Sequence, residues 1–213
     1  MAQFDLLVTG GTVVDGTGTP GYPADVAISG DRLRIVARPR VQDARDADRV
    51  IDATGKVVAH GFIDLHSHSD LMILADPRHE PKVRQVVTTE IIGVDGLSYA
   101  PIASQVDLDA LIEMNAGLDG RPDIRADWDS VAAYLGRMDG HVAVNVGLMV
   151  GNSALRISRL GWENVPADDR ALADMRAILA EAMAAGALGL SSGLEYPPGA
   201  FATTEELAAL SGE

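Results

Sequence analysis

The sequence predicts an α/β fold: a small β-sandwich segment over residues 1–60, followed by roughly the first half of a parallel (β/α)8 barrel over residues 61–213. Two observations support this division. The first sixty residues contain closely spaced short strands separated by glycine turns, which is typical of a small sandwich or meander. From Gly61 onward, β-branched strands alternate with helical periodicity, which favours parallel strand–helix units.

Short strands dominate the first sixty residues. Glycine next to a second turn-forming residue interrupts the apolar stretches at residues 10–11, 30–31 and 55–56. The charge-rich run over residues 43–49 is predicted to be a solvated loop. The strands predicted between these interruptions are residues 4–8, 12–15, 25–29, 32–37, 50–51 and 57–58.

Beyond Gly61, predicted strands alternate with segments of helical periodicity. The strands are predicted over residues 62–66, 86–93, 142–148 and 186–191. One helix is predicted over residues 128–138, behind an aspartate cap at Asp127 or Asp129. A second helix, over residues 166–185, begins with a proline and acidic residues and ends at a glycine. Its predicted core residues recur at helical spacing: Leu172, Met175, Leu179 and Met183.

The length of the second part limits how complete the barrel is. A (β/α)8 barrel typically needs about 250 residues, whereas about 150 residues follow the first sixty. We therefore expect half of a barrel, and a chain that is the N-terminal piece of a longer protein. Half a barrel by itself would expose the unpaired edge of a parallel strand.

Composition excludes several classes of function. Of the 213 residues, 47% are hydrophobic, which suits one or two globular domains. With 17 basic and 31 acidic residues the formal charge is −14, so no nucleic-acid or anionic-membrane partner is expected. Cysteine is absent, which excludes disulfides and thiolate ligands and fits a cytoplasmic location. No apolar run approaches the ~20 residues of a membrane span, and the N-terminus lacks a secretory signal.

Residues 59–70, Ala-His-Gly-Phe-Ile-Asp-Leu-His-Ser-His-Ser-Asp, contain the most informative motif. His66 and His68 lie two residues apart at the end of a predicted strand, where residues i and i+2 share a face. Two imidazoles on one face can bind one metal ion, with nitrogens at roughly 2.0–2.1 Å from zinc. His-x-His by itself is common in proteins without a metal, so the surrounding Gly-Phe-Ile-Asp and the following aspartate carry the specificity.

This string resembles the first-strand signature of the amidohydrolase superfamily, which comprises metal-dependent hydrolases with a (β/α)8 barrel. Further segments are similar to successive parts of the N-acyl-D-amino-acid deacylases (D-aminoacylases): residues 80–89 (EPKVRQVVTT), 96–101 (GLSYAP), 144–156 (VNVGLMVGNSALR) and 186–199 (GALGLSSGLEYPPG). Because these motifs occur in order along nearly the whole chain, the sequence is identified as the N-terminal portion of a member of that family.

The resemblance implies a β-sandwich, built from both chain ends, beside a metal-bearing barrel. The implied reaction is hydrolysis of the N-acyl amide of an N-acyl-D-amino acid to the D-amino acid and a carboxylate. The implied cofactor is a divalent cation, usually zinc, which lowers the pKa of its bound water toward 7 and polarises the scissile carbonyl. The general base is expected to be an aspartate beyond Glu213, so no catalytic residue is predicted within this chain.

By position, His66 and His68 match the first-strand metal pair of the family. Asp95 matches a position where the family often has a metal-bridging cysteine. An aspartate oxygen can bind zinc and would shift the preference toward harder ions such as manganese. The alternative is that Asp95 is a turn residue before Gly96. Asp64 is predicted either to orient an imidazole from behind the metal ligands or to cap the chain locally.

Tyr196 follows the fourth predicted strand, within the sequence Tyr-Pro-Pro-Gly. It lies on the predicted catalytic side, where its hydroxyl could hydrogen-bond the substrate, and a rigid structural turn is the alternative. Asn152 stands where relatives commonly carry histidine, and a structural role is expected for its amide. His79 and His141 have no partner pattern and are not predicted as ligands.

Two other interpretations stay open. A cyclic amidase of the hydantoinase or dihydroorotase type also has the His-x-His strand, but usually with a carbamylated lysine as bridging ligand, and no lysine follows Lys82 in this sequence. The third interpretation is a non-enzymatic chain, either an inactive truncated remnant or a subunit that completes its barrel with another chain. The expected partner is a small-molecule substrate, and a homo-oligomer or a missing C-terminal half is compatible with the sequence.

Overall fold

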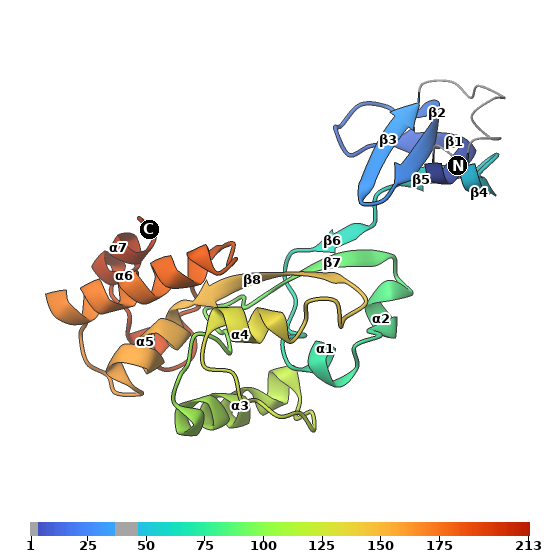
Figure 1. Ribbon diagram of the computed structural model, residues 1–213. Coiled ribbons are helices and arrows are strands. Elements are labelled where there is room, and N and C mark those ends of the chain that lie inside the picture. The colour runs from blue at the N-terminus through green and yellow to red at the C-terminus, as the bar shows by residue number, and fades with distance from the viewer. Residues whose placement is uncertain (1–3, 37–46) are drawn as a thin grey trace. The chain divides into compact units, whose positions relative to one another are not determined.

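The computed structural model describes residues 4–36 and 47–213, and the chain divides into two compact units that meet between Gly61 and Phe62 (Figure 1). The described residues of the first unit form strands and connecting turns. The second alternates parallel strands with helices. The predicted fold class, a small β unit followed by half of a parallel barrel, is therefore confirmed.

The N-terminal unit contains one mixed five-stranded sheet. Its strand order is β3-β2-β1-β4. Strand β5 pairs with the later part of β1, past the residues that pair with β4. Strands β1, β2 and β3 are antiparallel neighbours, whereas β4 and β5 run parallel to β1. A small core of Phe4, Leu7 and Ala27 lies on this sheet. The strand bounds are β1 Phe4–Val14, β2 Tyr22–Ser29, β3 Arg32–Val36, β4 Ala47–Asp52 and β5 Val57–Ala59.

Two predictions for this unit were wrong in detail. The glycine pair at residues 10–11 is a bulge inside one continuous strand β1, because Gly10 takes φ +75° and its amide donates to Asp25 Oδ1 at 3.0 Å. Of the predicted loop over residues 43–49, residues 47–49 belong to β4, and the remainder lies outside the described residues. The assignment of this unit to a sandwich built from both chain ends stays a prediction.

The second unit is a curled sheet of four parallel strands, in the order β6-β7-β8-β9. The strands are β6 Phe62–Asp64, β7 Val87–Ile92, β8 Asn145–Gly151 and β9 Gly189–Ser191. The helices between and after them are α1 Met72–Ala75, α2 Glu80–Val83, α3 Gln105–Asp119, α4 Val131–Gly136, α5 Asn152–Leu160, α6 Asp169–Ala184 and α7 Thr204–Leu210, with a 3-10 turn at Gly199–Phe201. Among the described residues, no helix is both long and apolar enough to cross a bilayer.

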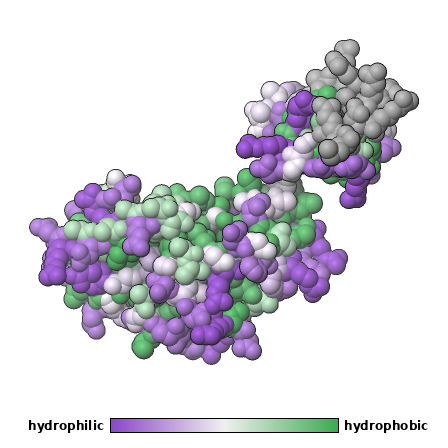
Figure 2. Space-filling model, viewed as in Figure 1, coloured by the Kyte–Doolittle hydropathy of each residue, from purple (hydrophilic) through white to green (hydrophobic). Residues whose placement is uncertain are grey.

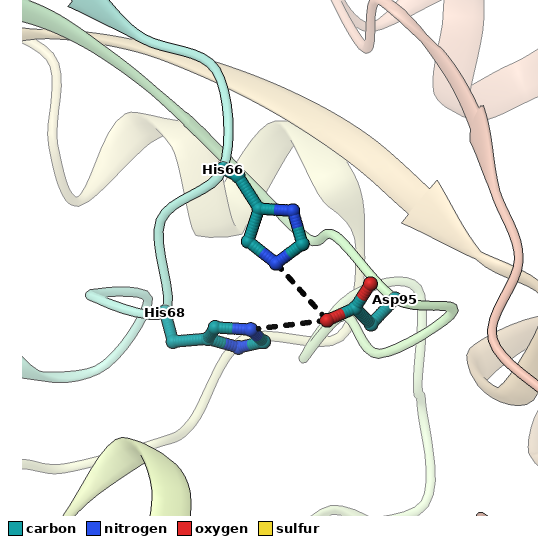
Figure 3. Close-up of side chains that lie close together, drawn as sticks. All are labelled: His66, His68 and Asp95. Carbon is teal, nitrogen blue, oxygen red and sulfur yellow. Dashed lines mark hydrogen bonds and ion pairs between the residues drawn. The ribbon is translucent and has the colours of Figure 1, made fainter. Parts of the chain in front are cut away.

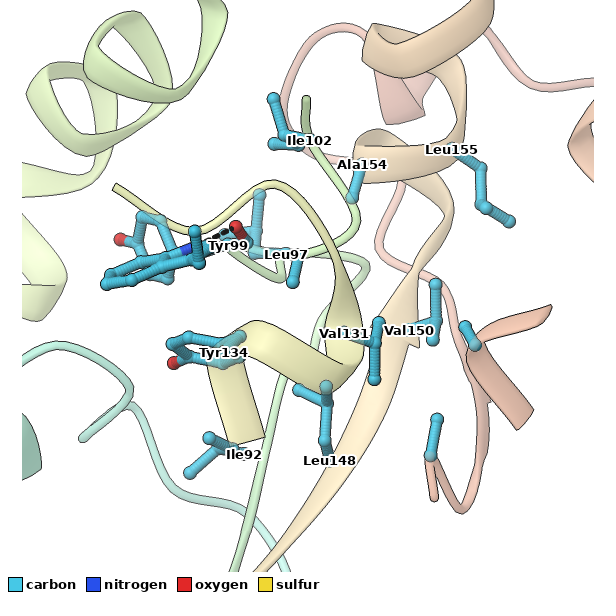
Figure 4. Close-up of a cluster of buried hydrophobic side chains, with 14 of the residues drawn as sticks. Ile92, Leu97, Tyr99, Ile102, Val131, Tyr134, Leu148, Val150, Ala154 and Leu155 are labelled. Atoms are coloured by element: carbon cyan, nitrogen blue, oxygen red, sulfur yellow. Dashed lines mark hydrogen bonds between the residues drawn. The ribbon is translucent and has the colours of Figure 1, made fainter. Parts of the chain in front are cut away.

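The core of the second unit lies between the strands and their helices. Figure 4 shows Leu148 and Val150 of β8 packed near Val131 and Tyr134 of α4, with Ile92 of β7 beside them. All five side chains are buried, so they form apolar core between the sheet and α4. This packing fixes the direction in which the strands end, and hence where the segments that follow them meet.

Some apolar side chains on and beside the strands stay in solvent. Phe62 and Ile63 of β6 and Leu188, just before β9, are each more than half exposed. Figure 2 shows apolar surface (green) on this unit between polar patches (purple). In a closed barrel, strand side chains pack against those of the other strands. Four strands cannot close a barrel, and these side chains are left uncovered.

Several predicted elements of the second unit need correction. Strand β8 begins three residues later than predicted, and the first predicted strand ends at Asp64, ahead of the histidines. Helix α4 is capped by Ser130, whose hydroxyl accepts from Ala133 N at 3.3 Å, and not by an aspartate. In α6, Met175 and Leu179 are buried as predicted, but Met183 is exposed. Helix α3 was not predicted at all.

A buried ion pair joins helices α5 and α7. Arg156 is fully buried and donates to Glu206 Oε2 at 2.5 Å and to Val165 O at 2.6 Å. Glu206 is also buried. Removing one partner of such a pair leaves an uncompensated buried charge, which costs about 3–5 kcal/mol. The pair therefore ties α7 to α5 through one guanidinium, in addition to the apolar packing of the buried Leu210 in the core.

We expect Arg156→Met to lower the free energy of unfolding by about 3–5 kcal/mol, because the Glu206 carboxylate is left buried without its cation. Arg159→Met is the matched control on the same helix. Its partner Asp174 is about half exposed, and an exposed pair contributes roughly 0–1 kcal/mol. Urea unfolding of the full-length protein measures both variants. Equal losses for the two variants would contradict the prediction.

Candidate metal centre

His66 and His68 lie in the segment that directly follows β6, and Asp95 lies in the loop that follows β7. The Nε2 atoms of both histidines approach the same oxygen, Asp95 Oδ2, at 3.0 Å from His66 and 3.2 Å from His68 (Figure 3). All three potential ligand atoms lie within 4.8 Å of one another. The structure thus brings together the three residues that the sequence predicts as metal ligands.

The donor set and its spacing fit a first-row divalent cation. Two imidazole nitrogens and one carboxylate oxygen are ligand types that zinc takes. Ligand atoms at 2.0–2.1 Å from a tetrahedral zinc ion are about 3.3 Å apart. The two nitrogen–oxygen distances at Asp95 are close to this separation. Three protein ligands of this kind leave coordination positions for water or substrate.

The turn that carries Asp95 is tightly enclosed by neighbouring backbone. Asp95 takes φ +54° and Gly96 takes φ +71°. A Cβ atom at Gly96 would lie 2.3 Å from Asn152 Oδ1 and 2.4 Å from Gly193 N, so the position requires glycine. Asn152 is fully buried, and its Nδ2 donates to Gly199 O at 3.3 Å. The loops after β7, β8 and β9 are thereby packed together around Asp95.

The centre is open to solvent on the side of His66. The side chains of His66 and Asp95 are 60% and 49% exposed, whereas that of His68 is 22% exposed. A cation or a small substrate can therefore reach the two nitrogens and the carboxylate without displacing core side chains.

A buried carboxylate lies behind His68. Asp119, the last residue of α3, places Oδ1 3.5 Å from His68 Nδ1, and its other oxygen accepts from the Tyr99 hydroxyl. Asp119 Oδ1 has no hydrogen-bond partner among the described residues. Burial raises the pKa of Asp119 above its ordinary value. A carboxylate at this position favours the tautomer with the proton on Nδ1, which leaves Nε2 free as a ligand. No sequence pattern indicated a role for Asp119, because α3 was not predicted.

Asp64 and Tyr196 are the other predicted site residues. Asp64 Oδ1 accepts from the backbone amide of His66 at 3.1 Å, and Oδ2 lies 2.5 Å from Lys82 Nζ. The hydrogen bond from Lys82 lowers the pKa of Asp64. The carboxylate thus contacts the backbone of His66 and not its ring. Tyr196 is exposed in the loop after β9, at the end of the sheet where the strands terminate, and its substrate-binding role stays a prediction.

Parallel barrel strands with a histidine pair after the first strand and a carboxylate after the second define a class of metal-dependent barrel hydrolases. The model of the amidohydrolase family matches residues 49–210, and this chain belongs to that family. The family predicted from the sequence is confirmed.

Within this family, the chain is similar to D-aminoacylases and to related N-acyl-D-amino-acid deacylases. The chain is 42% identical to the D-aminoacylase of Alcaligenes xylosoxydans xylosoxydans over 96% of its own length and 40% of that protein. A solved structure of D-aminoacylase with a binuclear metal centre superposes with a TM-score of 0.81 at 38% identity, over 98% of this chain and 42% of the other. The structure of N-acyl-D-glutamate deacylase from Bordetella bronchiseptica, solved with zinc and a phosphonate inhibitor, superposes with a TM-score of 0.80 at 32% sequence identity. The match covers 97% of this chain and 42% of the other. The chain spans about two fifths of the length of the proteins it matches.

We expect Asp95→Asn to weaken zinc binding at least about tenfold in the full-length protein, because a neutral amide replaces the charged oxygen between the imidazoles. Asp95→Cys should retain zinc and lose affinity for manganese, since thiolates prefer softer ions. Competition with a chromogenic chelator measures both affinities. Asp129→Asn, which is exposed and outside the centre, is the control. Unchanged zinc affinity in Asp95→Asn would show that Asp95 is only a turn residue.

Proposed function

We propose that the full-length protein is a metal-dependent hydrolase that cleaves the N-acyl amide of N-acyl-D-amino acids, releasing the D-amino acid and a carboxylate. The observation that carries the proposal is the convergence of His66, His68 and Asp95 at the end of the first two barrel strands. The 42% identity to a D-aminoacylase supports the substrate class. A small-molecule substrate and a cytoplasmic location belong to this proposal, the latter from the cysteine-free composition.

In this proposal His66, His68 and Asp95 hold a divalent cation, zinc in the first instance and manganese as the alternative. Such a cation supplies a Lewis acid for the scissile carbonyl and lowers the pKa of water toward 7. Asp119 holds the proton on Nδ1 of His68, so that Nε2 presents its lone pair. Tyr196 is proposed to hydrogen-bond the substrate. The general base is expected from the part of the protein beyond Glu213.

The cyclic-amidase interpretation is disfavoured by the surroundings of Lys82. Lys82 Nζ lies 2.5 Å from Asp64 Oδ2 and 3.1 Å from Glu90 Oε1, and these two carboxylates raise its pKa despite partial burial. An ammonium paired in this way is not available to form a carbamate, which requires the neutral amine. A non-enzymatic remnant or a barrel-completing subunit is the remaining alternative, and activity of the full-length protein separates it from the proposal.

We expect the full-length protein to release acetate from one or more N-acetyl-D-amino acids, to lose this activity on chelation, and to regain it with zinc or manganese. His66→Ala should lose metal and activity together, because one of the imidazole ligands is removed. His141→Ala is the matched control, since His141 is exposed, lies outside the candidate centre, and its Nδ1 hydrogen-bonds the nearby Asp139 carbonyl at 2.6 Å.

Separate outcomes contradict separate parts of the proposal. Hydrolysis of N-acetyl-L-amino acids alone would overturn the stereochemical part. Ring opening of hydantoin without deacylation would favour the cyclic amidase. A full-length protein that binds no divalent metal would remove the basis for the whole proposal.

A further inference from the structure

The segment that carries the two histidines presents two different faces. Its sequence is His66-Ser67-His68-Ser69. The histidines point toward Asp95 (Figure 3), whereas the hydroxyls of Ser67 and Ser69 are buried and contact Glu90. Alternate residues of this short segment therefore make the candidate metal centre on one face and a buried polar contact on the other.

Glu90 is the centre of that buried contact. It lies on β7 with no solvent exposure. Its Oε2 accepts from Ser69 Oγ in a short hydrogen bond and from Ser67 Oγ at 3.1 Å. Its Oε1 lies 3.0 Å from His79 Nε2 and 3.1 Å from Lys82 Nζ. An ionised carboxylate offers about four acceptor sites, and these four groups occupy them.

The charge of Glu90 is stabilised by these donors. Burial raises the pKa of Glu90, but the hydrogen bonds from Ser69, Lys82 and His79 outweigh it, and the pKa lies below its ordinary value. A fully satisfied buried carboxylate is rigid, because any movement of a donor leaves a charged oxygen without a partner.

The histidine segment has little other support from β7. Strand β6 ends at Asp64, and beyond it the described part of the chain shows one backbone hydrogen bond between the segment and β7, from Ser67 N to Ile91 O at 3.1 Å. The two serine hydroxyls add two further ties to the same strand, both through Glu90. The direction of the imidazoles thus depends on Glu90 more than on the sheet ladder.

We propose that Glu90 is a positioning residue of the metal centre: through Ser67 and Ser69 it fixes the backbone that aims His66 and His68 at the metal. This inference rests on the proposed function, because it assigns Glu90 to the same site. Glu90 touches neither the metal nor the substrate in this proposal. Its effect is on how well the two nitrogens are held at ligand geometry.

The first test is Ser67→Ala/Ser69→Ala in the full-length protein. It removes both links to the histidine segment and leaves Glu90 with Lys82 and His79. We expect zinc affinity, measured by chelator competition, to fall about tenfold, the low end of the range for residues outside the direct ligands. The control Ser158→Ala/Ser211→Ala removes two hydroxyls that donate to backbone carbonyls elsewhere, and it should bind zinc as the wild type does.

The second test is Glu90→Gln, which keeps the shape but replaces one acceptor oxygen with an NH2 group, a donor that must face two of the four donors around Glu90. We expect a larger loss of zinc affinity, and a changed visible absorption spectrum of the cobalt-substituted protein, which reports ligand geometry independently of stability. Glu80→Gln is the control, because Glu80 is partly exposed and pairs with Arg84 on α2.

Wild-type zinc affinity and an unchanged cobalt spectrum in Ser67→Ala/Ser69→Ala would overturn the inference and leave the proposed function intact. A wild-type protein that binds neither zinc nor manganese would overturn both. Weakened metal binding in the serine and Glu90 variants, with wild-type binding in both controls, would support the inference.

Discussion

The parallel pairing of β6 with β7 places the candidate centre. Beyond the end of β6, Ser67 N still donates to Ile91 O at 3.1 Å, so the chain leaving β6 runs beside the end of β7. Parallel strands end at the same edge of a sheet, and the segments that follow them meet there. His66 and His68 leave one strand and Asp95 leaves the other. Any shift in the β6–β7 register would separate the two imidazoles from the carboxylate.

Two buried carboxylates touch the histidine segment, and they differ in how fully they are hydrogen-bonded. Glu90 has four donors around its two oxygens, and its pKa is lowered. Asp119 accepts one hydrogen bond from Tyr99, its Oδ1 lies 3.5 Å from His68 Nδ1 with no hydrogen-bond partner among the described residues, and burial raises its pKa. The first is suited to holding the backbone in place. Asp119 directs its free acceptor, Oδ1, at the ring of His68. A proton on Nδ1 of that ring would supply the missing donor.

The sequence predicted the family and the grouping of His66, His68 and Asp95, because these depend on local motifs near strand ends. It predicted the fold class from the change at Gly61 from short strands with glycine turns to alternating strands and helices. It did not predict α3, because only part of the buried face of that helix is apolar: Leu108 and Leu111 are buried, and polar residues continue the same face. Val106 on α3 is exposed, whereas Asn115 and Asp119 are buried. Tertiary contacts, and not periodicity, decide which face of that helix is inside.

Glu90 could not have been predicted for a different reason. An acidic residue inside a β-branched strand shows no sequence pattern of its own, and the donors to Glu90 come from two other segments. Ser67 and Ser69 follow β6, while His79 and Lys82 lie at α2. The sequence left His79 without a partner, and the fold supplies one. Long-range polar contacts of this kind are set by the packing of segments and not by spacing along the chain.

The uneven exposure of the centre indicates which part of it this chain supplies. His68 is backed by Asp119 and mostly covered, whereas His66 and Asp95 are about half or more exposed. A hydrolytic metal site needs its ligands held on several sides and water excluded from the reacting atoms. The described residues provide candidate ligands from the segments after β6 and β7, with support from Asp119 and from the loops after β8 and β9. On the proposed function, groups that cover His66 are expected from outside the described residues. The chain spans about two fifths of the length of these relatives, so the proposed chemistry is that of the full-length protein.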